Sequence, residues 1–141
     1  MPTATLTRRV TFAAAHRYRR PEWDDARNEQ VFGACARQTY HGHSYVCDVT
    51  VRGPIDDMTG FVIDLGVLDN ALRTEVRERF DHRNINVDVP EFADGKLVPT
   101  GENLARFIFE RVQRAIGGAA TVTRVSVAED STLSAAYAIG D

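Results

Sequence analysis

The stretch His41-Gly42-His43-Ser44-Tyr45-Val46-Cys47-Asp48-Val49-Thr50-Val51 alternates in polarity and is typical of a β-strand with one buried face. Successive side chains of a strand point to opposite faces, so His41 and His43 share the face of the apolar residues that follow them. Gly42 lies between the two histidines, where it allows backbone or a ligand to come close. The strand therefore presents two imidazoles on one face.

A second alternating run covers residues 4–15 and ends at His16. Leu6, Val10, Phe12 and Ala14 share the parity of His16, so this strand also ends with a histidine on its apolar face. A lone histidine is usually a hydrogen-bonded core or surface residue. Three histidines at the ends of two neighbouring strands instead favour a zinc-type metal site.

The rest of the chain predicts two helices and two further strands. Asp64 can cap a helix that runs to about Phe80, and Thr100 can cap a second helix that ends at Gly117. Alternation predicts strands at 121–128 and 135–139, whereas residues 17–40 look like a long polar loop of the kind that often carries function. The order is β-β-α-α-β-β, an α+β fold with a four-stranded antiparallel sheet and two helices on one face.

Length and composition limit the possible classes. We expect the 141 residues to form a single domain, 1–141. The net charge of −3 argues against nucleic acid as a partner. The start of the chain lacks a signal-peptide pattern and no stretch is long enough to cross a bilayer, so we expect a cytoplasmic protein with no membrane partner.

The two long strands leave sheet edges available for pairing, and two helices can cover only one face of the sheet. Exposed edges are normally protected. Closing several sheets into a ring across subunits would protect them, so the sequence predicts a homo-oligomer.

Cys35 lies six residues before His41, in the loop that must pass beside the histidines. A thiolate near a dication or an imidazolium has a lowered pKa and can act as a base or nucleophile. The alternative is that Cys35 is a fourth zinc ligand in a closed structural site. Cys47 lies within a strand on the apolar parity and is expected to be a small buried residue.

Three further residues are candidates for proton transfer or ligand binding. Asp81 and His82 follow the first predicted helix; they are either a solvated helix end or, if they meet Cys35, a proton-transfer set in which the carboxylate orients the ring. Glu129 follows the third long strand. A carboxylate there can accept two parallel hydrogen bonds from an amino-pyrimidinone edge, or it can be a surface acid in a turn.

Several motifs occur together in one order along the chain. They are Phe12-Ala13-Ala14-Ala15-His16-Arg17, Phe32-Gly33-x-Cys35, His41-Gly42-His43-Ser44-Tyr45, Asp81-His82-Arg83-Asn84, Pro99-Thr100-Gly101-Glu102-Asn103 and Glu129. Together they resemble the 6-pyruvoyl-tetrahydropterin synthase family over almost the whole chain. The resemblance implies the tunnelling fold (T-fold), in which trimers close a β-barrel and two trimers stack as a homohexamer.

The resemblance also implies roles for individual residues. It implies Zn²⁺ on His16, His41 and His43, and a substrate, 7,8-dihydroneopterin triphosphate, bound between subunits. The implied catalytic residues are Cys35, Asp81 and His82, and the implied substrate-binding residues are Glu129 and Thr100. Arg17, Arg19 and Arg20 are candidates to hold the triphosphate, or they form a solvated loop face.

The branches of this family differ in product. One releases 6-pyruvoyl-tetrahydropterin; another releases 6-carboxy-tetrahydropterin and acetaldehyde on the route to queuosine, and its cysteine usually stands closer to the His-Gly-His motif. The interval from Cys35 to His41 resembles the pyruvoyl branch. A third branch, which cleaves the side chain for folate synthesis, has Glu in place of the cysteine. A non-catalytic zinc- or pterin-binding protein on the same fold is the alternative from another class.

Overall fold

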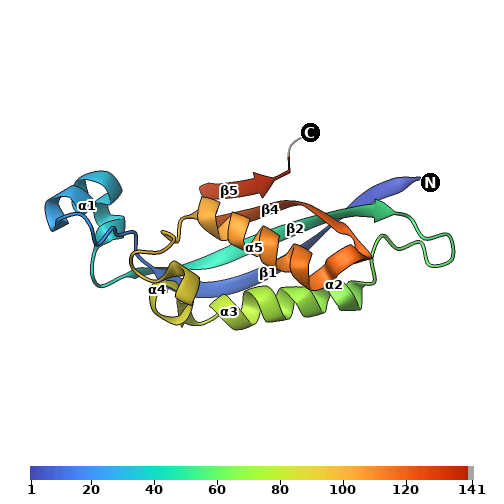
Figure 1. Ribbon diagram of the computed structural model, residues 1–141, viewed down its shortest axis with the longest axis horizontal. Coiled ribbons are helices and arrows are strands. Elements are labelled where there is room, and N and C mark those ends of the chain that lie inside the picture. The colour runs from blue at the N-terminus through green and yellow to red at the C-terminus, as the bar shows by residue number, and fades with distance from the viewer. Residues whose placement is uncertain (140–141) are drawn as a thin grey trace.

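The computed structural model describes residues 1–139 and shows a twisted sheet with its long helices on one face (Figure 1). The strands in sheet order are β3 (Arg83–Asn84), β1 (Thr3–His16), β2 (His41–Pro54), β4 (Thr121–Asp130) and β5 (Leu133–Ala138). All neighbours pair antiparallel except β1 and β3. The α+β class and the four longer strands agree with the sequence prediction.

The prediction of four strands is incomplete because the sheet has a fifth, β3. This strand has only two residues and pairs in parallel with Ala14 and Ala15 at the end of β1. A two-residue strand has no alternation that sequence reasoning can detect. The final strand also starts earlier than predicted, at Leu133 rather than at residue 135.

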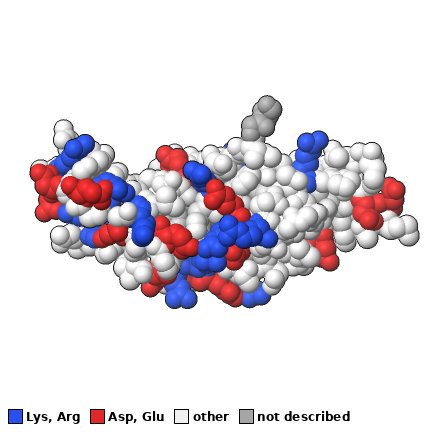
Figure 2. Space-filling model, viewed as in Figure 1, with Lys and Arg blue, Asp and Glu red and all other residues white. Residues whose placement is uncertain are grey.

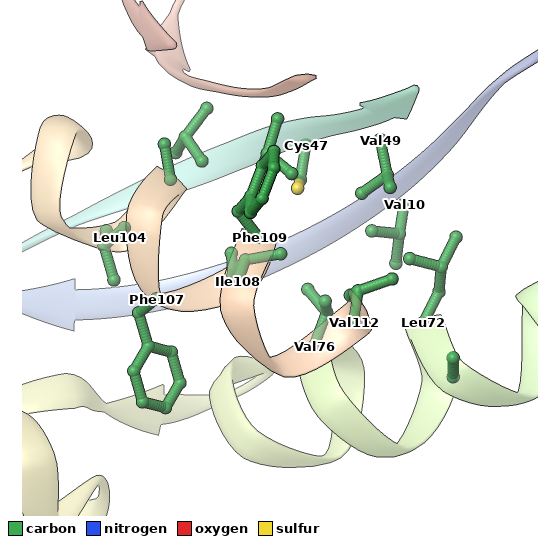
Figure 3. Packing of buried hydrophobic residues seen from close by; sticks show 14 of the residues in the cluster. Val10, Cys47, Val49, Leu72, Val76, Leu104, Phe107, Ile108, Phe109 and Val112 are labelled. Atoms are coloured by element: carbon green, nitrogen blue, oxygen red, sulfur yellow. The ribbon is translucent and has the colours of Figure 1, made fainter. Parts of the chain in front are cut away.

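One face of the sheet packs against the helices to form the core. Tyr45, Cys47, Val49 and Val51 of β2 are all fully buried, as the alternation predicts. Figure 3 shows side chains from β1 and β2 meeting those of the helices, among them Val10, Cys47, Val49, Val76, Ile108 and Val112. A fully buried aliphatic side chain contributes roughly 1.5–3 kcal/mol to the stability of the fold, which is more than a typical surface ion pair contributes. This apolar layer is therefore the main source of stability.

The first predicted helix runs over α2 (Leu65–Leu72), a π-helical turn η2 (Arg73–Arg77) and α3 (Glu78–Phe80). Asp64 caps it by accepting a hydrogen bond from the backbone N–H of Gly66. The hydroxyl of Thr74 donates to the carbonyl of Asn70, a bond that competes with regular helix geometry at the start of the π-helical turn.

The second predicted helix is α5 (Gly101–Ile116), and its limits agree with the prediction. The hydroxyl of Thr100 accepts a hydrogen bond from the backbone N–H of Asn103, and the chain leaves the helix at Gly117, where φ is +57°. Leu104, Ile108 and Val112 fall at helical spacing and are fully buried. The helix lies across the sheet beside α2 (Figure 1).

The prediction that residues 17–40 form a loop is wrong. This segment contains α1 (Asp25–Phe32) and the 3-10 turn η1 (Gly33–Ala36), set at one end of the molecule (Figure 1). The fully buried side chain of Asn28 stabilises the segment by donating to the carbonyls of Arg20, Trp23 and Asp24. Because a buried amide rather than an apolar stripe holds α1, hydrophobic periodicity did not reveal it.

Two short elements between the long helices were also missed. They are α4 (Ile85–Asp88), capped by the side chain of Asn84, and the 3-10 turn η3 (Pro90–Phe92); a further 3-10 turn, η4 (Gly117–Ala119), follows α5. Each has four residues or fewer, too short for a periodic pattern.

Charged side chains of both signs are interspersed on the helical face of the molecule (Figure 2). Within residues 1–139, no helix has the length and apolar character required to cross a lipid bilayer.

Candidate metal and pterin site

The three histidines predicted as metal ligands lie together. His16 is directly opposite His41 in the β1–β2 ladder, and His43 is opposite Ala14. One ligand atom from each of the three lies within 4.8 Å of those of the other two. The centroids of the three rings are 4.6 to 5.0 Å apart. The antiparallel register, together with the period-two alternation, brings three imidazoles to one point.

Hydrogen bonding and burial prepare His16 to act as a ligand. Its Nδ1 atom lies 2.9 Å from the carbonyl oxygen of Pro99. Because a carbonyl can only accept, the proton of the neutral ring is on Nδ1, and Nε2 is unprotonated. Metal-ligating histidines commonly have such a partner. Burial lowers the pKa of His16 to about 4, so the ring is neutral at neutral pH. Burial also lowers the pKa of His41.

His43 has a buried nitrogen without a partner. Its Nε2 atom makes no hydrogen bond to any of the described residues and lies 3.8 Å from Oε2 of Glu129. A buried polar atom without a partner is costly, and a cation coordinated by Nε2 would satisfy it. The donor set fits zinc and the other divalent ions that prefer imidazole.

Glu129 lies near the end of β4 with only 8% of its surface exposed, so it is not a surface acid in a turn. Its Oε1 atom accepts a hydrogen bond of 2.7 Å from the hydroxyl of Tyr18. A pocket of about 500 Å³ opens beside it. The lining residues are Tyr18, Thr100, Gly101, Glu102, Val127, Glu129, Leu133, Ser134, Ala135 and Ala136. Both predicted substrate-binding residues, Glu129 and Thr100, therefore line one pocket, and Glu129 connects it to His43.

Cys35 is half-buried in η1, and its carbonyl oxygen accepts a hydrogen bond of 2.7 Å from the backbone N–H of Tyr18. Burial raises the pKa of the Cys35 thiol, and the negative charge of Glu129 raises it further. Among the described residues, the convergent set of metal donors contains the three histidines and not Cys35. The protein groups around Cys35 therefore favour the protonated thiol.

Asp81 and His82 lie at the outer edge of β1. Oδ1 of Asp81 accepts from the backbone N–H of Ala13 at 2.9 Å, and Oδ2 is 3.1 Å from Nδ1 of His82. That backbone hydrogen bond is the main cause of the lowered pKa of Asp81. The side chain of His82 is 85% exposed, and within residues 1–139 no hydrogen bond joins this pair to Cys35. In a single chain, the three predicted catalytic residues do not form one hydrogen-bonded set.

The arginines proposed for the triphosphate already have partners. Each forms an ion pair with a nearby acid: Arg17 with Asp94, Arg19 with Asp25, and Arg20 with Glu22. Binding a triphosphate at these residues would require competition with those carboxylates.

Sequence reasoning missed Tyr18. It shares the parity of His16, two residues further along the chain, but it lies beyond the end of β1, where alternation no longer predicts orientation. Burial and the neighbouring Glu129 raise the pKa of Tyr18, which keeps its hydroxyl protonated as a donor.

A pocket with a buried carboxylate, close to three convergent imidazoles on an α+β sheet, defines a candidate metal-dependent site for a small ligand. A sequence profile described as 6-pyruvoyl tetrahydropterin synthase matches residues 5–139. The chain belongs to the 6-pyruvoyl tetrahydropterin synthase family.

Individual relatives agree with this assignment. The 6-pyruvoyl tetrahydrobiopterin synthase of Drosophila melanogaster is 45% identical over 112 residues, 79% of this chain and 66% of the fly protein. The human protein of the same name is 38% identical over 113 residues, 80% of this chain and 77% of the human one. The structure of Caenorhabditis elegans 6-pyruvoyl tetrahydropterin synthase superposes with a TM-score of 0.92 at 33% identity, covering 99% of this chain and 98% of the other. The predicted family is thus confirmed, and so is the predicted fold at the level of the single α+β chain.

Proposed function

We propose that this protein is a zinc-dependent carbon–oxygen lyase that converts 7,8-dihydroneopterin triphosphate to 6-pyruvoyl-tetrahydropterin with loss of triphosphate. The observation that carries this proposal is the convergence of His16, His41 and His43 beside the pocket that contains Glu129. Membership of the family and the names of the fly and human relatives support the choice of substrate.

In this proposal Glu129 anchors the pterin ring. Its carboxylate accepts hydrogen bonds from the amino group and ring N–H of the pterin, and Thr100 contributes a hydroxyl on the same pocket wall. The pterin side chain then extends toward the three histidines. His16, His41 and His43 would hold zinc, which would supply Lewis-acid chemistry that acidifies the side-chain hydroxyls and favours thiolate at Cys35.

Cys35 acts as the base that removes protons from side-chain carbons. His82, oriented by its 3.1 Å contact with Asp81, exchanges protons as triphosphate leaves. Hydrogen is redistributed within the pterin, so the reaction requires no redox cofactor. Because Cys35 and His82 are not hydrogen-bonded within one chain, His82 of one subunit is proposed to act in the site of a neighbouring subunit.

The sheet edges support an oligomer. Among the described residues, β5 pairs only with β4, and the outer edge of β1 is paired only where it meets β3. Pairing β5 of one copy with β1 of the next would protect both edges and close a barrel of strands. We propose a trimer built in this way and, by the family resemblance, a homohexamer of two trimers. Mass measurement in solution tests this stoichiometry.

Product analysis with the purified protein tests the activity. The protein and 7,8-dihydroneopterin triphosphate should yield triphosphate and the 6-pyruvoyl product, with one zinc per chain by elemental analysis. Acetaldehyde and 6-carboxy-tetrahydropterin would instead assign the chain to the queuosine branch. An inert protein that still binds pterin, or one whose zinc has four protein ligands, would contradict a catalytic role.

A further inference from the structure

We propose that Tyr18 is a positioning residue, whose hydroxyl group holds the carboxylate of Glu129 in the orientation that accepts the pterin ring. This inference rests on the proposed function, because it deepens the account of the same pocket. It concerns a residue to which neither the family motifs nor the strand patterns assign a role.

Tyr18 contacts each of the three chemical parts of the site. Its hydroxyl donates to Oε1 of Glu129 at 2.7 Å. Its ring packs edge-on against His16, with centroids 4.9 Å apart. Its backbone N–H donates to the carbonyl of Cys35 at 2.7 Å. One residue therefore links the carboxylate, the metal-binding histidines and the cysteine.

The ring of Tyr18 is itself held in place. It makes edge-on contacts with the ring of His16 and with the ring of Phe32 in α1, whose centroid is 5.9 Å away. The hydroxyl consequently meets Glu129 from a packed ring rather than from a freely rotating side chain. A rigid donor of this kind fixes its partner more effectively than a mobile one.

One oxygen of the Glu129 carboxylate is held by a hydrogen bond, and the other is not hydrogen-bonded to His43. Oε1 accepts the tyrosine hydroxyl, and Oε2 lies 3.8 Å from Nε2 of His43. An ionised carboxylate has about four acceptor positions, so the hydroxyl occupies one and leaves others for the pterin. Both Tyr18 and Glu129 line the pocket, which places the remaining acceptor positions where a flat amino-pyrimidinone can reach them.

Loss of this hydrogen bond should weaken pterin binding and have little effect on the rate of the chemical step. A hydrogen bond to a charged group changes an equilibrium by about tenfold or more. Tyr18→Phe removes the hydroxyl and keeps the ring. The matched control is Tyr40→Phe, which removes a hydroxyl that makes no hydrogen bond to the described residues and keeps the ring beneath the Arg17 guanidinium.

The experiment measures the Kd of neopterin by fluorescence, and kcat and KM with 7,8-dihydroneopterin triphosphate, for the zinc-loaded wild type and both variants. We expect Tyr18→Phe to raise the Kd and KM about tenfold or more, with kcat within threefold and zinc content unchanged. Tyr40→Phe should match the wild type. An unchanged Kd in Tyr18→Phe, a loss confined to kcat, or a loss of zinc would overturn the inference.

The neopterin measurement separates this inference from the proposed function. If the wild type binds neopterin but releases no pyruvoyl product, the proposed function is wrong. The change in Kd for Tyr18→Phe still tests the role of Tyr18 in that case. If the wild type makes the product and Tyr18→Phe binds and turns over normally, only the role of Tyr18 fails. A wild type that does not bind neopterin would overturn the role of Tyr18 directly.

Discussion

The imidazole of His16 is hydrogen-bonded to the carbonyl of Pro99, a residue 83 positions further along the chain, at 2.9 Å. Pro99 directly precedes Thr100, the residue that caps α5. The contact therefore ties the end of β1 to the start of the helix that forms one wall of the pocket. It also sets the tautomer of the buried ring, on which metal binding depends.

The buried His16 should make the metal-free protein less stable in mild acid. Its pKa in the folded chain is about 4, against 6.5 for the ordinary value, because burial penalises the charged ring. Below pH 6.5 the unfolded chain takes up a proton that the folded chain excludes, so stability falls as the pH falls from 6.5 to 4. The loss is on the order of 3 kcal/mol.

Urea unfolding of chelator-treated protein across this pH range, at fixed protein concentration, measures the effect. The His16→Gln variant is the control, since it lacks the titrating group and should show a shallower slope. Equal slopes for the wild type and His16→Gln would contradict the prediction.

Cys35→Ala should abolish turnover and leave ligand binding intact. The proposed base is lost, and such groups contribute typically about 10²–10⁴-fold to rate. Since Cys35 is not part of the convergent histidine set, zinc content and neopterin affinity should remain those of the wild type. Loss of zinc together with activity would show instead that the thiol is a ligand.

Two inactive variants should restore activity when they are combined. If His82 serves the site of a neighbouring subunit, a mixed oligomer of Cys35→Ala and His82→Ala chains contains some sites in which both residues are intact. Unfolding and refolding the two proteins together should yield activity that neither has alone. The same mixture stays inactive if both residues act within one chain.

Asn28→Ala should destabilise the segment that carries Cys35. The Asn28 side chain donates to three carbonyls and accepts from the backbone N–H of Arg20, so removing it leaves buried polar groups unpaired. A cost of about 1–3 kcal/mol is expected for such a loss. Thermal unfolding measures it, with Glu29→Ala on the exposed side of the same helix as the control. Equal midpoints for the two variants would exclude a special role for the amide.

Patterns within the sequence were sufficient to predict the long strands, the two main helices and the histidine cluster. The period of two along β1 and β2 depends only on local backbone geometry, so the faces of His16, His41 and His43 follow directly from their parity. The caps at Asp64 and Thr100 are likewise local, because a side chain bonds a backbone N–H two or three residues away.

Only the tertiary structure decided what surrounds those histidines. The hydrogen bond of Tyr18 to Glu129 joins residues 111 positions apart, and the approach of Glu129 to His43 depends on how β4 is placed beside β2. The helix around Asn28 depends on one buried amide that satisfies carbonyls of the preceding turn. Such contacts arise when distant segments are packed together, and no periodicity within a single segment encodes them.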